Sequence, residues 1–214
     1  MSGQGNNKGR FITLEGGEGV GKSTQIRLLA DYLRGQGIEV VETREPGGTP
    51  GAEAIRALLL GGEVDRWHPR AEALLFAAAR SDHVERVIRP ALARGVWVLC
   101  DRYVDSNRAY QAGASGLEDA DIMAAHAVGS QGLMPDRTIV LTVPLEIAMQ
   151  RAALRDAGQG DRFGARGPEF HERVAAAFLA YAQEEPARFH VVDASATPAE
   201  VNVKIIETLA DILL

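Results

Sequence analysis

Short apolar runs alternate with stretches of helical periodicity along most of the chain. Five of the runs predict β-strands: FITLE at 11–15, GIEVVET at 37–43, VWVLC at 96–100, RTIVLTV at 137–143 and FHVVD at 189–193. Each run is a few residues long and is followed by polar or glycine-containing segments, as strands usually are. VWVLC is apolar throughout, which is typical of a strand buried on both faces of a sheet.

Helical periodicity fills the stretches between these runs. Helices are expected over 22–34, near 52–60, over about 70–94, near 118–129, from about Pro144, over 169–184 and after Thr197. Pro90 predicts a kink or break in the long segment, because proline lacks an N–H and clashes with the preceding turn. Thr197, Pro198 and Glu200 predict a capped start for the last helix. The stretch that follows VWVLC is interpreted as a polar loop.

The alternation of strands and helices predicts an α/β fold with one parallel sheet covered by helices on both faces. Ligands of such sheets bind beyond the carboxyl ends of the strands. We expect a flexible polar tail at 1–9 and a single domain over 10–214. DAGQGDRFGARGP at 156–168 has no apolar periodicity and is interpreted as a mobile segment.

Composition narrows the class of protein. The chain has 46% hydrophobic and 24% charged residues, which is ordinary for a globular domain. A net charge of −6 argues against broad nucleic-acid binding, and no apolar run approaches the roughly 20 residues that span a bilayer. Cys100 is the only cysteine, so no intrachain disulfide can form, which fits a reducing cytoplasm.

A glycine-rich stretch after the first strand predicts a phosphate site. Its spacing is that of a P-loop, Gly16-x-x-x-x-Gly21-Lys22-Ser23, and it lies between a strand and a helix as the pattern requires. The glycines let backbone N–H groups face phosphate oxygens at a helix N-terminus. Lys22 is expected to reach the β- and γ-phosphates, and the Ser23 hydroxyl to coordinate Mg²⁺. A P-loop NTPase-type fold is therefore expected, with an ATP site formed by Gly16, Gly17, Glu18, Gly19, Val20, Gly21, Lys22, Ser23 and Thr24.

A P-loop serves several classes of protein. A GTPase would need an NKxD stretch, but NKGR at 7–10 lacks the aspartate, and no LSGGQ-like signature of an ABC transporter is present. A second anion site favours a kinase: Asp101 and Arg102 follow a buried strand, where the carboxylate can hold Mg²⁺ and the guanidinium can bind a phosphate bidentately. A nucleotide-dependent switch without catalysis remains the alternative of another class.

LCDRYVDSNRAYQ at 99–111 resembles the thymidylate kinase signature, D-R-Y/F/H-x-x-S-x-x-A-Y-Q. EGGEGVGKST at 15–24, TREPGGT at 43–49, AAR ending at Arg80 and DRF at 161–163 resemble other motifs of that family, although Gly164 stands where a glutamate is often found. The similarity runs from about residue 10 to the C-terminus. It implies ATP-dependent phosphorylation of dTMP to dTDP by in-line transfer with Mg²⁺, in dTTP synthesis, by a cytoplasmic homodimer.

The resemblance also implies an acceptor site. Arg102 would grip the 5′-phosphate of dTMP, with Arg44 and Arg56 nearby. Phe76 would stack on thymine, and Arg80 would hydrogen-bond to a base carbonyl. The helical wheel supports this pair, because Phe76 and Arg80 share a face of the segment 70–94. A face that packs against another helix or subunit is the alternative.

The remaining acceptor contacts follow in the same way. Asn107 and Gln111 would face the base edge, and Tyr110 would crowd the sugar 2′ position. Glu18 would turn away from the polyphosphate and accept a hydrogen bond from the sugar 3′-hydroxyl. The expected acceptor site is thus Glu18, Arg44, Pro46, Arg56, Phe76, Arg80, Arg102, Ser106, Asn107, Tyr110 and Gln111.

Transfer between two phosphates brings anions together, so positive charge must be supplied at the reacting groups. The P-loop contains no arginine, and family members of this kind supply it from a lid, here about 152–168. Arg155 is the first choice, followed by Arg151 and Arg162, whereas Arg166 is expected to be solvated. Lys22 and Arg102 complete the expected catalytic set. A kinase for another nucleoside monophosphate or a deoxynucleoside is the enzymatic alternative.

Overall fold

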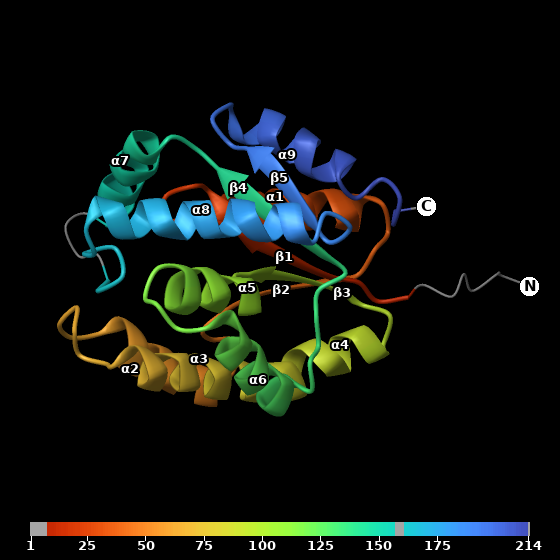
Figure 1. Cartoon of the computed structure of the whole chain (residues 1–214). Coiled ribbons are helices and arrows are strands. Elements are labelled where there is room, and N and C mark those ends of the chain that lie inside the picture. The colour runs from red at the N-terminus through yellow and green to blue at the C-terminus, as the bar shows by residue number, and fades with distance from the viewer. Residues whose placement is uncertain (1–7, 157–160, 214) are drawn as a thin grey trace, which may run out of the picture.

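The computed structural model describes residues 8–156 and 161–213, without the side chains of 155 and 156. It confirms the five parallel strands and the P-loop NTPase-type fold. The sheet has the order β2-β3-β1-β4-β5 and lies between layers of helices (Figure 1). Its strands are β1 (Phe11–Glu15), β2 (Val40–Arg44), β3 (Trp97–Asp101), β4 (Arg137–Thr142) and β5 (Phe189–Asp193).

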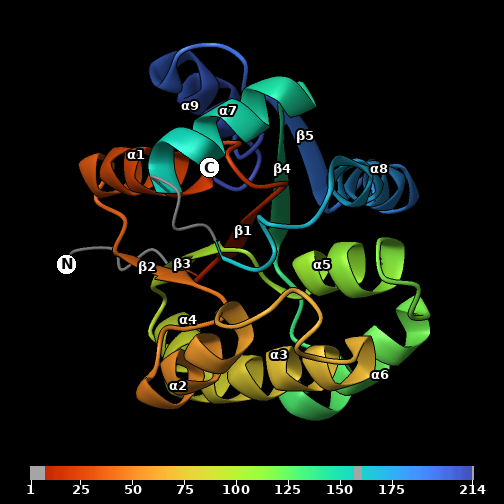
Figure 2. The same ribbon diagram turned by 90° about the vertical axis from the view of Figure 1, so that its left-hand side faces the viewer.

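Helices cover both faces of the sheet, as Figure 2 shows from a second side. One layer contains α1 (Lys22–Gly35) and α9 (Pro198–Glu207), and the other contains α2 (Pro50–Leu60), α3 (Pro69–His83), α4 (Arg89–Ala93) and α6 (Asp119–Ser130). Two more helices, α7 (Leu145–Asp156) and α8 (Pro168–Glu184), follow β4. Leu29, Leu33 and Ile205 pack beneath the first layer, and Val84 and Ile88 beneath the second. Burial of this apolar surface is the main force that holds the layers to the sheet.

The long segment 70–94 is helical throughout, and Pro90 changes its geometry without ending it. A π-helical turn, Val84–Ile88, joins α3 to α4 just before Pro90. Such turns accommodate a proline whose missing N–H interrupts the α-helical bonding. The capped start of α9 is also confirmed: the Thr197 hydroxyl accepts from the Glu200 N–H at 3.4 Å, and the Glu200 carboxylate accepts from the Thr197 N–H at 3.0 Å.

The interpretation of a polar loop after β3 was wrong. Residues 104–113 form the short helix α5 (Val104–Asn107) and a second π-helical turn, Arg108–Gly113. Their buried positions mix apolar residues such as Val104 and Ala109 with polar ones, Asp105, Asn107 and Gln111. An apolar stripe is the usual sign of a helix in a sequence, and the buried polar side chains interrupt that stripe here.

Strand register brings three loops to one edge of the sheet. Asp101 of β3 pairs with Leu14 of β1 and with Arg44 of β2, so the segments that follow these strands leave the sheet side by side.

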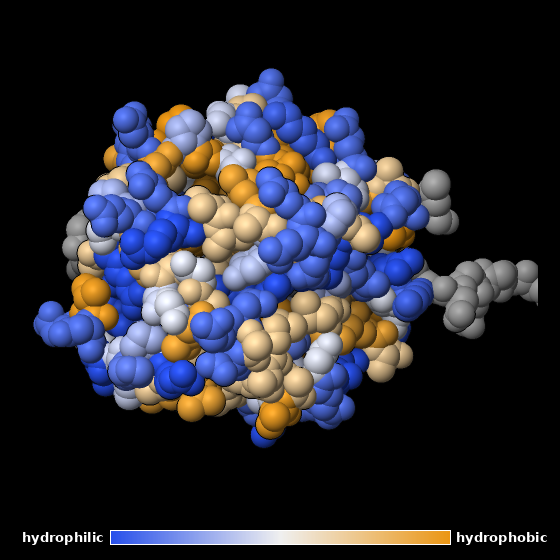
Figure 3. Space-filling view, in the orientation of Figure 1, coloured by the Kyte–Doolittle hydropathy of each residue, from blue (hydrophilic) through white to orange (hydrophobic). Residues whose placement is uncertain are grey.

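The face seen in Figure 3 mixes hydrophilic and hydrophobic residues. Within residues 8–156 and 161–213, no helix is long and apolar enough to cross a membrane.

Candidate active site

A cleft of about 650 Å³ opens at this edge of the sheet. Every residue of the expected acceptor site lines it, together with Lys22, Ser23 and Asp101. These side chains come from the P-loop, from β2 and β3 and the segments after them, and from α2, α3, α5 and α7. The fold therefore gathers residues that are up to 145 positions apart, from Glu18 to Phe163, around one space.

The P-loop packs tightly against its neighbours. At Gly16, where φ is +128°, an added Cβ would lie 2.4 Å from the Leu141 carbonyl oxygen. At Gly19, where φ is +72°, an added Cβ would lie 2.0 Å from the Ala148 carbonyl oxygen. Only glycine fits at these two positions. Gly19 and Gly21 line the cleft, whereas Gly16, Gly17 and Val20 face a second cavity between the loop, β4, α7 and α8.

Lys22 is buried at the base of the loop. Its ammonium donates to the carbonyl oxygens of Gly17 at 2.7 Å and of Gly16 at 3.3 Å. Burial, followed by the nearby Arg102 charge, lowers the pKa of Lys22 to about 8. Anionic phosphate oxygens would favour the charged form of this group, so a polyphosphate and Lys22 suit each other.

Ser23 and Asp101 form a pair of oxygen ligands beside the P-loop. The Ser23 hydroxyl donates to the Asp101 carboxylate at 2.7 Å. Hydroxyl and carboxylate oxygens suit Mg²⁺, which usually takes one or two protein ligands and fills its shell with phosphate oxygens and water. Among the described residues, no group of three or more His, Cys, Asp or Glu side chains could hold a metal by itself. The two residues therefore fit a magnesium ion that arrives with a nucleotide.

Arg102 lies at the centre of the cleft in a strained backbone conformation, with φ of +69°. Its guanidinium donates to Glu18 Oε1 at 2.5 Å, Gly16 O at 2.9 Å, Ser106 Oγ at 3.1 Å and the Tyr110 hydroxyl at 3.2 Å. Burial opposes its charge, but Tyr110 and Glu18 outweigh this effect and raise the pKa of Arg102. The Glu18 side chain thus reaches from the P-loop toward Arg102.

Arg44 and Arg56 add two more positive charges to the cleft. Arg44 is exposed and pairs with Glu53 at 3.3 Å. Arg56 is half-buried and donates to the Pro46 carbonyl oxygen at 2.8 Å. Burial and the neighbouring Arg44 lower the pKa of Arg56, so its charged form gains from any anion that enters.

Phe76 and Arg80 lie one helical turn apart on α3 and both face the cleft. Arg80 is buried, and its Nε donates to the Glu45 carboxylate at 2.7 Å while an Nη donates to Asn107 Oδ1. The Phe76 ring lies 5.8 Å from that of Phe163. The face shared by Phe76 and Arg80 therefore borders an open space and does not simply pack against a helix.

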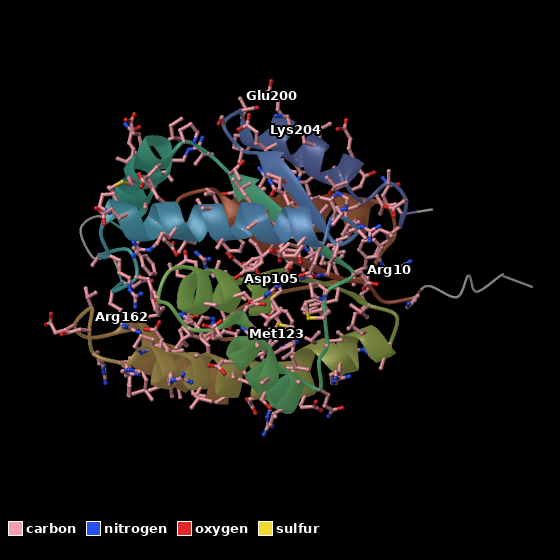
Figure 4. The ribbon with its side chains drawn as sticks, viewed as in Figure 1. Arg10, Asp105, Met123, Arg162, Glu200 and Lys204 are labelled. Atoms are coloured by element: carbon pink, nitrogen blue, oxygen red, sulfur yellow. The ribbon has the colours of Figure 1, made fainter. Side chains whose placement is uncertain are left out.

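The four arginines of the expected lid and of the helix that leads into it differ in position. Arg151 of α7 lines the cleft and donates to the Ala194 carbonyl oxygen at 3.2 Å. Arg155 lies in α7, but its side chain is outside the described residues. Arg162 does not line the cleft: it is buried beside the end of α2, where it donates to the carbonyl oxygens of Leu59 and Val64 and pairs with Glu72 (Figure 4).

Arg166 is not solvated, so that prediction was wrong. Its guanidinium pairs with Glu72 at 3.3 Å, donates to the Ser115 hydroxyl at 3.2 Å and lies 4.4 Å from the centre of the Phe170 ring. A carboxylate 94 positions earlier in the chain determines this burial, and a local pattern cannot reveal such a partner.

Several residues of the cleft were absent from the expected set. They are Glu45, Leu60, Tyr103, Asp161 and Phe163. Glu45 directly follows β2 inside TREPGGT, and Phe163 ends DRF, so position after a strand and membership of a motif could have indicated these two. Leu60 ends α2 and carries no comparable signal.

Comparisons with known proteins agree with the geometry of the cleft. The profile of the thymidylate kinase family matches residues 14–205. The chain belongs to the thymidylate kinase family. It is therefore an enzyme of the nucleoside monophosphate kinase class. The thymidylate kinase of Rhizorhabdus wittichii is 58% identical over 205 residues, which cover 96% of this chain and 99% of the relative.

Two further thymidylate kinases support this membership. That of Caulobacter vibrioides is 55% identical over 192 residues, 88% of this chain and 90% of the relative. The crystal structure of the thymidylate kinase from Ehrlichia chaffeensis matches with a TM-score of 0.75 at 32% identity, over 94% of this chain and 98% of the other. The fold and the sequence thus lead to the same family.

Proposed function

We propose that the cleft transfers the terminal phosphate of ATP directly to dTMP and releases dTDP and ADP. The P-loop amides and Lys22 bind the donor polyphosphate, and Arg102 binds the acceptor phosphate. One contact carries this assignment: Arg102 donates at 2.9 Å to the carbonyl oxygen of Gly16, the first glycine of the P-loop. A phosphate held by Arg102 therefore lies next to the loop that holds the donor, as in-line transfer requires.

The rest of the acceptor fills the cleft beyond Arg102. Phe76 offers a face on which thymine stacks, and Arg80 donates to a base carbonyl. Tyr110 limits the room at the sugar 2′ position, and Glu18 accepts from the 3′-hydroxyl. Glu18 and Arg102 pair at 2.5 Å, so binding of dTMP replaces one carboxylate partner of Arg102 with the phosphate and releases Glu18 for the sugar.

Arginines supply positive charge for the transfer, and Ser23 and Asp101 would hold a Mg²⁺ ion, which would neutralise charge on the phosphates. Arg151 lines the cleft, whereas the donors of Arg162 are engaged by Leu59, Val64 and Glu72. We therefore assign charge stabilisation to Arg151 and Arg155 ahead of Arg162.

The working enzyme is a cytoplasmic homodimer with ATP and dTMP as its ligands. Leu74 of α3 and Val128 of α6 are 63% and 87% exposed, on helices that pack together, and a second copy would cover them. Cys100 is a buried free thiol, which suits a reducing compartment. Sedimentation velocity gives the mass of the assembly.

Replacement of Arg102 tests the acceptor assignment. Arg102→Ala removes the group that binds the acceptor phosphate, so kcat/KM for dTMP is expected to fall about a hundredfold or more. The affinity for ATP, measured by calorimetry, remains, because the P-loop and Lys22 are untouched. Arg94→Ala, an exposed arginine after α4, is the matched control. An equal loss of ATP affinity in Arg102→Ala would refute the role.

A panel of acceptors tests the choice of substrate. ADP formation is measured with dTMP, dUMP, UMP, dCMP, AMP and thymidine. We expect dTMP to give the fastest release of ADP. A kinase for another acceptor would prefer a different member of the panel, and a nucleotide-dependent switch would release no ADP in response to any of them.

A further inference from the structure

A row of hydrogen-bonded, buried polar side chains runs from Arg80, in the wall of the cleft, to Glu72, which does not line the cleft. Glu72 lies on α3, one turn before Phe76 and two before Arg80, and is 1% exposed. Its Oε1 accepts from Gln111 Nε2 at 2.7 Å. Gln111 Oε1 accepts from Asn107 Nδ2 at 2.9 Å, and Asn107 Oδ1 accepts from Arg80. The row therefore joins Glu72 to Arg80 through two amides.

The two ends of the row fix the direction of both amides. A side-chain amide can present either its oxygen or its NH₂ to a neighbour. A carboxylate only accepts hydrogen bonds, so Glu72 requires the NH₂ of Gln111. A guanidinium only donates them, so Arg80 requires the oxygen of Asn107. If both amides were reversed, the Asn107 NH₂ would face the donors of Arg80 and the hydrogen bond would be lost.

Glu72 also pairs with two arginines of the expected lid segment. Its Oε2 pairs with Arg162 and, at 3.3 Å, with Arg166. A glutamine at position 72 would be drawn with its oxygen toward these two cations. Its NH₂ would then face Gln111, which would have to turn its own oxygen toward it. Asn107 would then have to turn its oxygen toward Gln111, so its NH₂ would face the donors of Arg80.

We propose that Glu72 is a positioning residue for recognition of the acceptor base. It sets the direction of Gln111 and Asn107, and through them it holds Arg80 so that its donors meet a carbonyl of the base. The inference rests on the proposed acceptor site. Since a guanidinium cannot accept a hydrogen bond, the pocket matches bases with a carbonyl at this place, as thymine and uracil have, and not an exocyclic amino group.

Glu72→Gln tests the proposal, with affinities for dTMP, dUMP, dCMP and ATP measured by calorimetry. We expect dTMP and dUMP to bind about tenfold to a hundredfold more weakly, and equally so, because they share the carbonyl edge. ATP binding stays within threefold of the wild type, and dCMP gains no affinity. Glu85→Gln, an exposed glutamate in the next turns of the same helical segment, is the matched control and binds all four as the wild type does.

Three outcomes overturn the role of Glu72. An affinity for dTMP within threefold of the wild type would show that the direction of the amides does not depend on it. A loss of affinity for dTMP that far exceeds the loss for dUMP would place the defect at the contacts of the 5-methyl group, which dUMP lacks. An equal loss for ATP would indicate general damage, as a merely structural residue would cause.

Loss of one buried charge can prevent folding, so a second variant accompanies the first. Glu72→Gln combined with Arg162→Met removes both charges of the buried pair and leaves Arg166 to attract the glutamine oxygen. It is expected to show the same equal losses for dTMP and dUMP. Arg80→Met separates this inference from the function on which it rests. If Arg80→Met leaves dTMP binding unchanged, the acceptor site and the role of Glu72 both fail. If it weakens dTMP while neither Glu72 variant does, only the role of Glu72 fails.

Discussion

Arg102 shows how much of the site depends on the contacts of a single side chain. A position after a buried strand and before a tyrosine marks it in the sequence, but its partners come from the P-loop and from α5 and the turn beyond it. The pair with Glu18 holds the guanidinium beside the P-loop. This arrangement limits the side-chain freedom that substrate binding must remove.

Tyr110 is the residue on which rejection of ribonucleotides should depend. Its ring lies 6.0 Å from that of Phe163 and 5.9 Å from that of Phe170, and its hydroxyl accepts from Arg102. Tyr110→Ala is expected to lower the ratio of kcat/KM for dUMP over UMP about tenfold, because these acceptors differ only at the 2′ position. Tyr110→Phe keeps the ring and should keep the ratio. An unchanged ratio in Tyr110→Ala would show that Tyr110 does not exclude ribonucleotides.

Among the secondary-structure elements, those that bury apolar faces could be predicted from the sequence. All five strands and the long helices fall where the periodicity placed them. The helical turns over 104–113 could not be predicted, because Asp105, Asn107 and Gln111 are buried through hydrogen bonds to residues as far away as Arg188. A sequence pattern records which side chains avoid water, and it does not record which distant partner satisfies a buried polar group.

The hydrogen bonds that join Glu15 to the start of α5 predict that the stability of the fold depends on pH. Glu15, the last residue of β1, is fully buried and accepts from the Tyr103 N–H at 2.7 Å and from the Ser106 hydroxyl at 2.5 Å. Burial, followed by the charge of Asp105, raises the pKa of Glu15 to about 8. The native state then keeps a proton that the unfolded state has lost, so this contribution to stability is complete below about pH 4.5 and disappears as the pH rises through 8.

Urea unfolding of the wild type and of Glu15→Gln measures this contribution. Glutamine imitates the protonated carboxyl, so the variant lacks the titration while other groups cancel in the difference. The free energy of unfolding of the wild type, relative to the variant, should fall by up to about 1.4 kcal/mol per pH unit between pH 5 and 8. A difference that stays flat over this range would mean that Glu15 is ionised in the native protein.

At the scale of the whole molecule, the sheet explains why the candidate site could be predicted in part. The P-loop, the segment after β2 and Asp101 with Arg102 meet because parallel strands end at one edge, and that much follows from strand order. The burial of Arg162 and Arg166 does not follow, since it depends on Glu72, which lies 90 and 94 positions earlier in the chain. Family resemblance named the residues that line the cleft more readily than the residues that hold them in place.

The same long-range bonding ties the two halves of the sheet together at Asp105. Figure 4 places this residue in the interior, between α8 and α6. Its carboxylate accepts from Thr138 of β4 at 3.1 Å, from Arg108 at 3.2 Å and from Arg188, just before β5, at 2.5 and 3.0 Å. Three stretches that are far apart in the sequence, 105–108, 138 and 185–188, thus share one buried charge, and Glu185 just after α8 pairs with both arginines.

Asp105→Asn should therefore weaken the whole fold. It leaves Arg108 and Arg188 with less negative charge in the interior, and the free energy of unfolding is expected to fall by about 3–5 kcal/mol. Asp121→Asn, which breaks the exposed pair with Arg70, is the control and should change it by less than about 1 kcal/mol. Because the charge of Asp105 also helps to raise the pKa of Glu15, the variant should move the Glu15 transition to lower pH. A variant as stable as the control, with the Glu15 transition unmoved, would show that Asp105 does not couple these elements.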